Sequence, residues 1–357
     1  MLNFTVGPVM SEKEVLEEGR KSSPYFRTSE FSDIMIQNEK LMLEFLKAPE
    51  GSRCVFLTSS GTGAMESCVM NLISGNDKVL IVNGGSFGQR FAEMCRLHKR
   101  NYTEIKCDFG KQLKASQLEP FNNQGYTAFL VNMGETSSGI LYDMNLISEF
   151  CKRNNIFLIV DAISTFISDE IDMTNLNAGA IITGSQKALA VHPGISVVAL
   201  SPAAINRVEV NPEICMYLSL KSALKNGERG QTPWTPAVTT LLEINKRLTN
   251  IKNKGGIEEE RKNIIKLNTE FRNFIKTLPF EFVSETMSNT VTALHPVNVG
   301  AKSIIEIMKK DYGIWLCPNG GDKADIVFRV GHIGHIRDDD NKKLIDSFAD
   351  MQKRGLL

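Results

Sequence analysis

The chain has 357 residues, of which 42% are hydrophobic, so it is long enough to bury the cores of two domains. Its 41 Lys and Arg residues balance 41 Asp and Glu residues, which excludes any argument from composition for nucleic acid, an anionic membrane or a polyanionic partner. A small, nearly neutral ligand is the better expectation.

The N-terminus, MLNFTVGPVMSEKEV, has no basic segment followed by an apolar one, so it does not read as a signal peptide. No run of about 18 apolar residues, the length that would cross a membrane, occurs in the chain. The seven cysteines are scattered without CxxC spacing, which is typical of reduced thiols rather than of disulfides or a metal site. We therefore predict a cytoplasmic protein.

A polar stretch at 18–33 is expected to be a loop, and from residue 53 short apolar runs alternate with helical patterns. Continuous apolar strands separated by helices predict an α/β domain over residues 15–235, with a seven-stranded, mostly parallel sheet covered on both faces. Ligands of such sheets bind beyond the carboxyl ends of the strands. The strands are expected at 53–58, 78–83, 102–107, 126–133, 156–162, 178–184 and 194–201.

After about residue 235 the pattern changes. Helical patterns at 237–252 and 257–276 meet at the breaker NKGG, and short strands and helices follow, ending in a helix from Asp338. We predict a smaller α+β domain formed by residues 236–357 together with residues 1–14.

The first two strands of the α/β pattern end in small residues. SSGTGAMES (59–67) would let a backbone approach a ligand, and the helix that starts there offers free N–H groups to a phosphate. The spacings of the P-loop and of the dinucleotide fingerprint are both absent. In NGGSFGQRF (83–91), Phe87 stands among small and polar residues, where it can stack on a planar ring.

Three further strand ends carry polar groups. MGETSSGI (133–140) offers hydroxyls, Asp161 ends an otherwise apolar strand, and TGSQK places Lys187 after another strand. A phosphate cradle, an aromatic ring, hydroxyls, a buried carboxylate and a lysine together match the groups of pyridoxal phosphate, whose aldehyde condenses with a lysine amine.

These motifs resemble those of the class V pyridoxal-phosphate aminotransferases of the alanine–glyoxylate, serine–pyruvate and 2-aminoethylphosphonate–pyruvate type. The resemblance runs from TVGPVM (5–10) through the motifs above to TPWTPAV (232–238) and FRVGHIG (328–334), which is nearly the whole chain. It implies fold type I of the pyridoxal-phosphate-dependent transferases, a homodimer with shared active sites, and amino transfer from a small amino acid to a 2-oxo acid by a ping-pong mechanism.

The resemblance also implies a role for each site residue. Lys187 would form the Schiff base and move the substrate α-proton, Asp161 would pair with the pyridine nitrogen, and Phe87 would stack on the ring. Thr136 would reach the phenolic oxygen, and Arg329 would bind the substrate carboxylate. The phosphate would be bound by Ser60, Gly61, Thr62 and Gln186, and by Thr235 of the neighbouring subunit.

Two alternatives stay open from the sequence. A cysteine desulfurase or selenocysteine lyase shares the fold and needs a reactive cysteine, for which Cys317 is the candidate by position. A protein that binds the cofactor without catalysis is the second. The residues do not decide the donor and acceptor, nor the roles of Arg27 and Trp234. His192, His332 and His335 are interpreted as structural or supporting residues.

Overall fold

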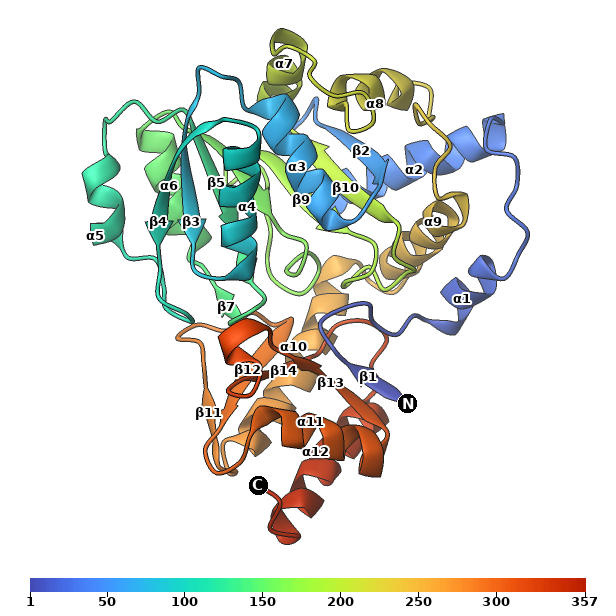
Figure 1. The fold of residues 1–357 in the computed structure, drawn as a ribbon. Coiled ribbons are helices and arrows are strands. Elements are labelled where there is room, and N and C mark those ends of the chain that lie inside the picture. The colour runs from blue at the N-terminus through green and yellow to red at the C-terminus, as the bar shows by residue number, and fades with distance from the viewer.

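The computed structural model describes residues 1–357 and has two lobes (Figure 1). The larger, α/β lobe contains a seven-stranded sheet in the order β2-β10-β9-β8-β5-β3-β4. Its strands are β2 (Arg53–Thr58), β3 (Lys78–Asn83), β4 (Asn101–Lys106), β5 (Ala128–Asn132), β8 (Phe157–Asp161), β9 (Ala178–Gly184) and β10 (Ile195–Leu200). The prediction of a seven-stranded, mostly parallel sheet is therefore confirmed.

One strand runs against the others. β10 pairs antiparallel with both β9 and β2, whereas β3, β4, β5, β8 and β9 pair in parallel. The apolar run at 194–201 by itself gave no sign of this reversal. Only the ten residues 185–194, without a helix, separate β9 from β10, and a parallel return needs a longer crossover connection.

Helices cover both faces of this sheet. α3, α4, α7 and α8 pack on one face, with their buried side chains in one apolar cluster, and α2, α6 and α9 pack on the other. The bounds are α1 (Lys13–Gly19), α2 (Ser29–Phe45), α3 (Gly61–Leu72), α4 (Ser86–Leu97), α5 (Ala115–Leu118), α6 (Met144–Arg153), α7 (Pro202–Val210), α8 (Leu220–Gly227) and α9 (Val238–Asn253), with a 3-10 turn η1 (Glu119–Phe121).

Local sequence explains several helix starts. Asp143 accepts the N–H groups of the first turn of α6, and Ser201 caps α7, whose first residue is proline. The expected loop at 18–33 is shorter than predicted, because Thr28 accepts the Phe31 N–H and starts α2 at Ser29. The polar composition of this stretch predicted a loop, but the capping hydrogen bond at Thr28 favours a helix start there.

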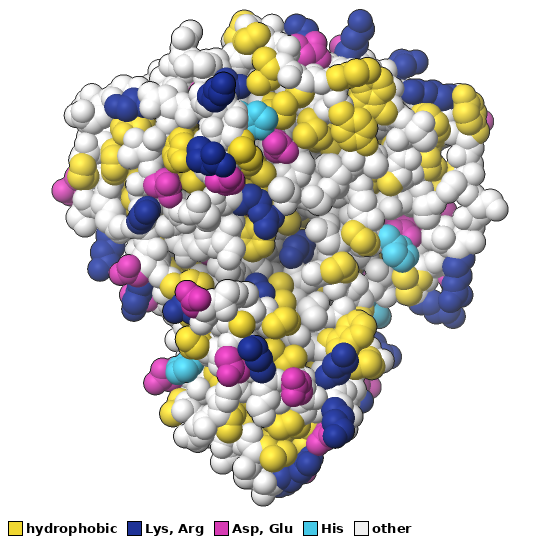
Figure 2. Space-filling view, viewed as in Figure 1, with side chains coloured by type: hydrophobic (Ala, Val, Ile, Leu, Met, Phe, Trp, Pro, Cys, Tyr) yellow, Lys and Arg dark blue, Asp and Glu magenta, His cyan; other side chains and the backbone are white.

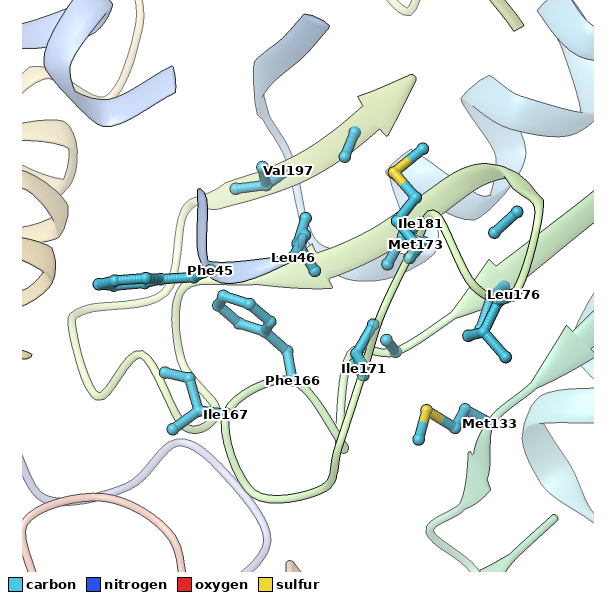
Figure 3. Close-up of a cluster of buried hydrophobic side chains, with 14 of the residues drawn as sticks. Phe45, Leu46, Met133, Phe166, Ile167, Ile171, Met173, Leu176, Ile181 and Val197 are labelled. Atoms are coloured by element: carbon cyan, nitrogen blue, oxygen red, sulfur yellow. The ribbon is translucent and has the colours of Figure 1, made fainter. Parts of the chain in front are cut away.

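Figure 3 shows part of the larger core, where the segment after β8 lies against the sheet. Phe166 and Ile171 pack beside Ile181 of β9 and Val197 of β10. These side chains are almost completely buried, so the segment that follows Asp161 is held rigidly against the strands. Rigid support of this kind fixes the position of polar groups at the strand ends.

The smaller lobe is an α+β unit with a five-stranded sheet in the order β1-β13-β14-β12-β11. The N-terminal strand β1 lies here, parallel to β13 and far in sequence from its neighbours (Figure 1). The elements are β1 (Leu2–Phe4), α10 (Ile257–Ile275), β11 (Phe280–Phe282), β12 (Val291–Pro296), α11 (Ala301–Tyr312), β13 (Ile314–Pro318), η2 (Gly321–Lys323), β14 (Phe328–Gly331) and α12 (Asp338–Lys353).

The domain boundary at 235/236 stays a prediction. Apolar residues of α9, such as Leu241 and Leu248, lie in the core of the larger lobe, whereas Phe271 of α10 lies in the core of the smaller one. A short hairpin, β6 (Gly134–Glu135) with β7 (Ile140–Leu141), reaches toward the smaller lobe. None of the helices is both long and apolar enough to cross a membrane.

Candidate active site

The carboxyl ends of β2, β3, β5, β8 and β9 lie at one edge of the large sheet, the edge that faces the smaller lobe (Figure 1). A buried network joins the lobes beside this edge. Asp169 accepts hydrogen bonds from Ser288 Oγ (2.6 Å) and the Asn289 N–H (2.9 Å) of the smaller lobe. Near Asp169 the two lobes are therefore joined by direct hydrogen bonds.

Lys187 lies in the turn between β9 and β10. Its Nζ donates a hydrogen bond of 2.5 Å to the carbonyl of Val6, in the N-terminal segment. Gly7 packs on its side chain: a Cβ at this position, where φ is +114°, would lie 2.7 Å from Lys187 Cδ. Burial, helped by the charges of Arg329 and Arg90, lowers the pKa of Lys187 to about 8, although the charges of Cys317 and Asp161 act in the opposite direction.

A pKa of about 8 in place of 10.5 makes the neutral amine roughly 300 times more abundant at neutral pH. The neutral form is the nucleophile and the base. The position of Lys187 therefore suits covalent and proton-transfer chemistry better than a solvated surface lysine would.

Asp161 is the last residue of β8 and is 5% exposed. Its Oδ1 accepts the Ile163 N–H at 2.8 Å, and its Oδ2 accepts Asn132 Nδ2 at 2.5 Å. Burial raises the pKa of Asp161 to about 6, although both hydrogen bonds oppose the rise. The carboxylate is thus buried, oriented and able to hold a cationic partner.

Asn132, the final residue of β5, is a site residue that was not predicted from the sequence. The register of β5 and β8 places it directly beside Asp161. Its Oδ1 is buried without a hydrogen-bond partner. The amide therefore interacts with the rest of the site through the hydrogen bond that Nδ2 donates to Asp161. A polar residue closing an otherwise apolar strand was the available signal.

The predicted phosphate cradle is the start of α3. Ser60 is its N-cap residue, and no side chain caps the helix. Within the chain, the backbone N–H groups of Gly61 and Thr62 have no acceptor, as expected at a helix start. Gly61 packs against Ile163, since an added Cβ would lie 2.4 Å from Ile163 Cδ1. Small residues here allow close packing and leave donors free.

Phe87 is the second residue of α4, and its position is fixed by Glu135. The Glu135 Oε2 accepts the N–H groups of Phe87 (3.0 Å) and Gly88 (3.1 Å), and Oε1 accepts Ser137 Oγ (2.5 Å). Arg90, from the same helix, has its Cζ 4.8 Å from the centre of the Phe87 ring. Glu135 and Arg90 lie in the motifs MGETSSGI and NGGSFGQRF, but neither was predicted to belong to the site.

Arg329 extends from β14 of the smaller lobe to the larger one. Its Nη1 donates to the Thr136 carbonyl at 3.0 Å, and its Nη2 donates to the Pro318 carbonyl at 2.6 Å. Its Nε is buried without a partner. Cys317 faces Arg329 across the β13–β14 pair. Thr136 and Arg329, 193 residues apart, are therefore in direct contact.

Gln186 and Thr235 lie in different surroundings. Gln186 is half-buried directly before Lys187, with its Oε1 against Gly184. Thr235 is exposed and forms no hydrogen bond with any other predicted site residue. It lines a surface pocket with Tyr217 and Trp234. The structure brings Gln186 to the strand-end site and leaves Thr235 on the outer surface.

Arg27 supports the segment that carries Thr235. Its guanidinium donates to the carbonyls of Thr232 (2.9 Å) and Pro233 (3.3 Å), and to Gln231 Oε1 (3.2 Å). Trp234 Nε1 is buried without a partner. Arg27 thus orders the backbone around the predicted partner-facing segment, and it forms no ion pair.

None of the three histidines forms a hydrogen bond with a predicted site residue. His192 Nδ1 lies 2.6 Å from Glu243 Oε1, and the exposed His335 uses its N–H to bond the Met10 carbonyl. His332 is buried between Phe4 and Phe271, and burial lowers its pKa to about 3. A structural role for these three histidines stays a prediction.

A family model, two curated relatives and a solved structure that match this chain are all aminotransferases. Residues 16–325 match the family model described as aminotransferase class-V. An uncharacterized aminotransferase of Helicobacter pylori is 29% identical over 341 residues, covering 94% of this chain and 89% of the relative. Serine–glyoxylate aminotransferase of Arabidopsis thaliana is 24% identical over 94% of this chain and 86% of its own. A solved aspartate aminotransferase of Thermus thermophilus, 24% identical, superposes with a TM-score of 0.92 over 99% of both chains.

Proposed function

Because this chain belongs to the class-V aminotransferases, we propose that it transfers the amino group of a small amino acid to a 2-oxo acid of the pyruvate or glyoxylate class. The observation that carries the proposal is that Lys187, whose pKa is lowered to about 8, lies close enough to the buried carboxylate of Asp161 for the two charges to influence each other. An amine and a buried acid at adjacent strand ends are the pair that amino transfer on pyridoxal phosphate needs.

The residues present fit that cofactor. The uncapped start of α3 offers Ser60, Gly61 and Thr62 to the phosphate. Phe87 is held in place by Glu135, ready to stack on the ring. Additional contacts are proposed for Gln186 with the phosphate and for Thr136 with the phenolic oxygen.

Each catalytic residue has a defined task in this proposal. The cofactor supplies an aldehyde that condenses with amines and a protonated ring that withdraws electrons. Lys187 Nζ takes the substrate α-proton and returns it, first as base and then as acid. Asp161 keeps a proton on the ring nitrogen. Arg329 binds the α-carboxylate with its fork of donors, which here contact the carbonyls of Thr136 and Pro318.

We further propose a homodimer in which Thr235 completes the phosphate site of a second copy. Thr235 is exposed and lies beside Tyr217. The neighbouring segment 210–217 exposes large apolar side chains, including Val210 (69%) and Met216 (72%), and Figure 2 shows hydrophobic side chains gathered over this end of the larger lobe, near α8. Exposed apolar patches of this kind are typical of protein interfaces.

A cytoplasmic location is also part of the proposal. All seven cysteines are free, and four of them are buried. Reduced thiols are the usual state of cysteine in that compartment.

The experiment is a matrix of amino donors and 2-oxo acid acceptors tested on the purified protein. Conversion of at least one donor and acceptor pair, with ping-pong kinetics, is expected. Sulfide release from cysteine without amino transfer would favour the desulfurase reading through Cys317, which nothing in the structure or the comparisons favours. Cofactor binding without any half-reaction would favour a non-catalytic protein.

A further inference from the structure

Arg90 occupies a position between two predicted parts of the cofactor site. Helices α3 and α4 lie side by side on one face of the sheet (Figure 1). From α4, Arg90 Nη1 donates to Thr62 Oγ1 at 2.7 Å, at the start of α3. Its Cζ lies 4.8 Å from the centre of the Phe87 ring. One guanidinium therefore contacts both the cradle and the aromatic ring.

The charge of Arg90 is not neutralised within the chain. It forms no ion pair, whereas Arg96 on the same helix pairs with Glu93. Glu135 is the carboxylate at the start of α4, and it accepts the N–H groups of Phe87 and Gly88 without forming an ion pair with Arg90. The cradle side of the site thus combines free N–H groups of a helix start with a cation that has no acidic partner, an arrangement that favours an anion.

A phosphate group can accept more of the hydrogen bonds that Arg90 is able to donate than the single hydroxyl of Thr62 can. The guanidinium has five N–H donors in a planar fork, and the hydrogen bond to Thr62 uses only one of its nitrogens. Thr62 Oγ1, as the acceptor of that bond, keeps its own proton free to donate to another acceptor. Both groups can therefore donate to one phosphate at the same time.

We infer that Arg90 is a cofactor-binding residue that recognises the phosphate group together with Thr62, while its stacking on Phe87 keeps the ring and phosphate ends in fixed relation. This inference rests on the proposed function.

The test compares two ligands that differ only in the phosphate. Pyridoxal phosphate and pyridoxal are titrated into cofactor-free wild-type protein, Arg90→Met, Arg90→Lys and the control Arg96→Met, with binding followed by fluorescence quenching. Arg90→Met should weaken pyridoxal phosphate binding about tenfold or more, as expected for lost hydrogen bonds to a charged group, and leave pyridoxal binding nearly unchanged. Arg90→Lys should recover part of the loss, and Arg96→Met should match wild type.

A second measurement does not depend on the Schiff base. Inorganic phosphate should raise the thermal unfolding temperature of the wild-type protein and of Arg96→Met, and have a smaller effect on Arg90→Met and Arg90→Lys. If the protein bound no pyridoxal phosphate but phosphate still stabilised it through Arg90, the proposed function would fail and the anion site would stand. Equal losses of both ligands in Arg90→Met, or no difference between variants in either measurement, would overturn the inference.

Discussion

Replacement of Asn132 by Leu should raise the pKa of Asp161 above its present value of about 6. Leucine keeps the branched skeleton and the number of side-chain heavy atoms of asparagine, although its methyl groups are bulkier, and the change removes the 2.5 Å hydrogen bond from Asn132 Nδ2 to Asp161 Oδ2. It also removes a buried oxygen, Asn132 Oδ1, that has no partner. The substitution therefore acts mainly on the carboxylate.

The size of the change follows from the bond that is lost. A hydrogen bond to a charged group contributes about 1.5 to 3 kcal/mol, and one pKa unit corresponds to about 1.4 kcal/mol. The pKa of Asp161 should therefore rise by about one to two units, to between about 7 and 8. At neutral pH the carboxyl of Asn132→Leu would then be about half to nine-tenths protonated and would pair less well with a protonated ring nitrogen.

Infrared titration of the cofactor-free protein measures this directly. The carboxylate band of Asp161 is isolated by subtracting the spectrum of Asp161→Asn, and its midpoint is compared between wild type and Asn132→Leu. Asn38→Leu, which removes a buried asparagine between α2 and α9, is the control and should leave the midpoint unchanged. An unchanged or lowered midpoint in Asn132→Leu would refute the assignment of the amide N–H to Asp161.

Further predictions concern the other site residues. Lys187→Ala should lose the cofactor that borohydride fixes to the protein while keeping weaker binding through the phosphate; wild-type amino transfer by this variant would contradict the role of Lys187. Asp161→Asn should slow the single-turnover half-reaction by orders of magnitude with a modest loss of cofactor affinity, and an unchanged rate would show that another group protonates the ring. Thr235→Val should weaken cofactor binding by about 1 to 3 kcal/mol and weaken the linkage between cofactor and dimer in sedimentation; equally tight binding by a monomer would show that one chain builds the site. The folded state lowers the pKa of Lys187 from 10.5 to about 8, so between these values the unfolded chain binds more protons, and urea unfolding should show that stability rises with pH relative to Lys187→Met; parallel stability curves would contradict the lowered pKa.

The sequence was sufficient for the fold class and for locating candidate site residues near the strand ends. Apolar runs placed strands such as β2, β3 and β9 at their observed bounds, because burial of a strand on both faces leaves a continuous local signal. Asp161 and Lys187 stood out for a related reason. A charged group that ends a buried strand must be paired or used, so its position is informative without any contact being known.

Tertiary structure alone decided which groups meet. Lys187 donates a hydrogen bond to the carbonyl of Val6, which is 181 residues away in the sequence. Arg329 of the smaller lobe likewise donates to the Thr136 carbonyl of the larger lobe. Asn132 faces Asp161 only because β5 and β8 pair in one register. The reversal of β10 likewise depended on a short connection rather than on its own residues. Local patterns report burial and periodicity, whereas hydrogen-bond partners depend on strand register and on packing between distant segments, which no single stretch of sequence encodes.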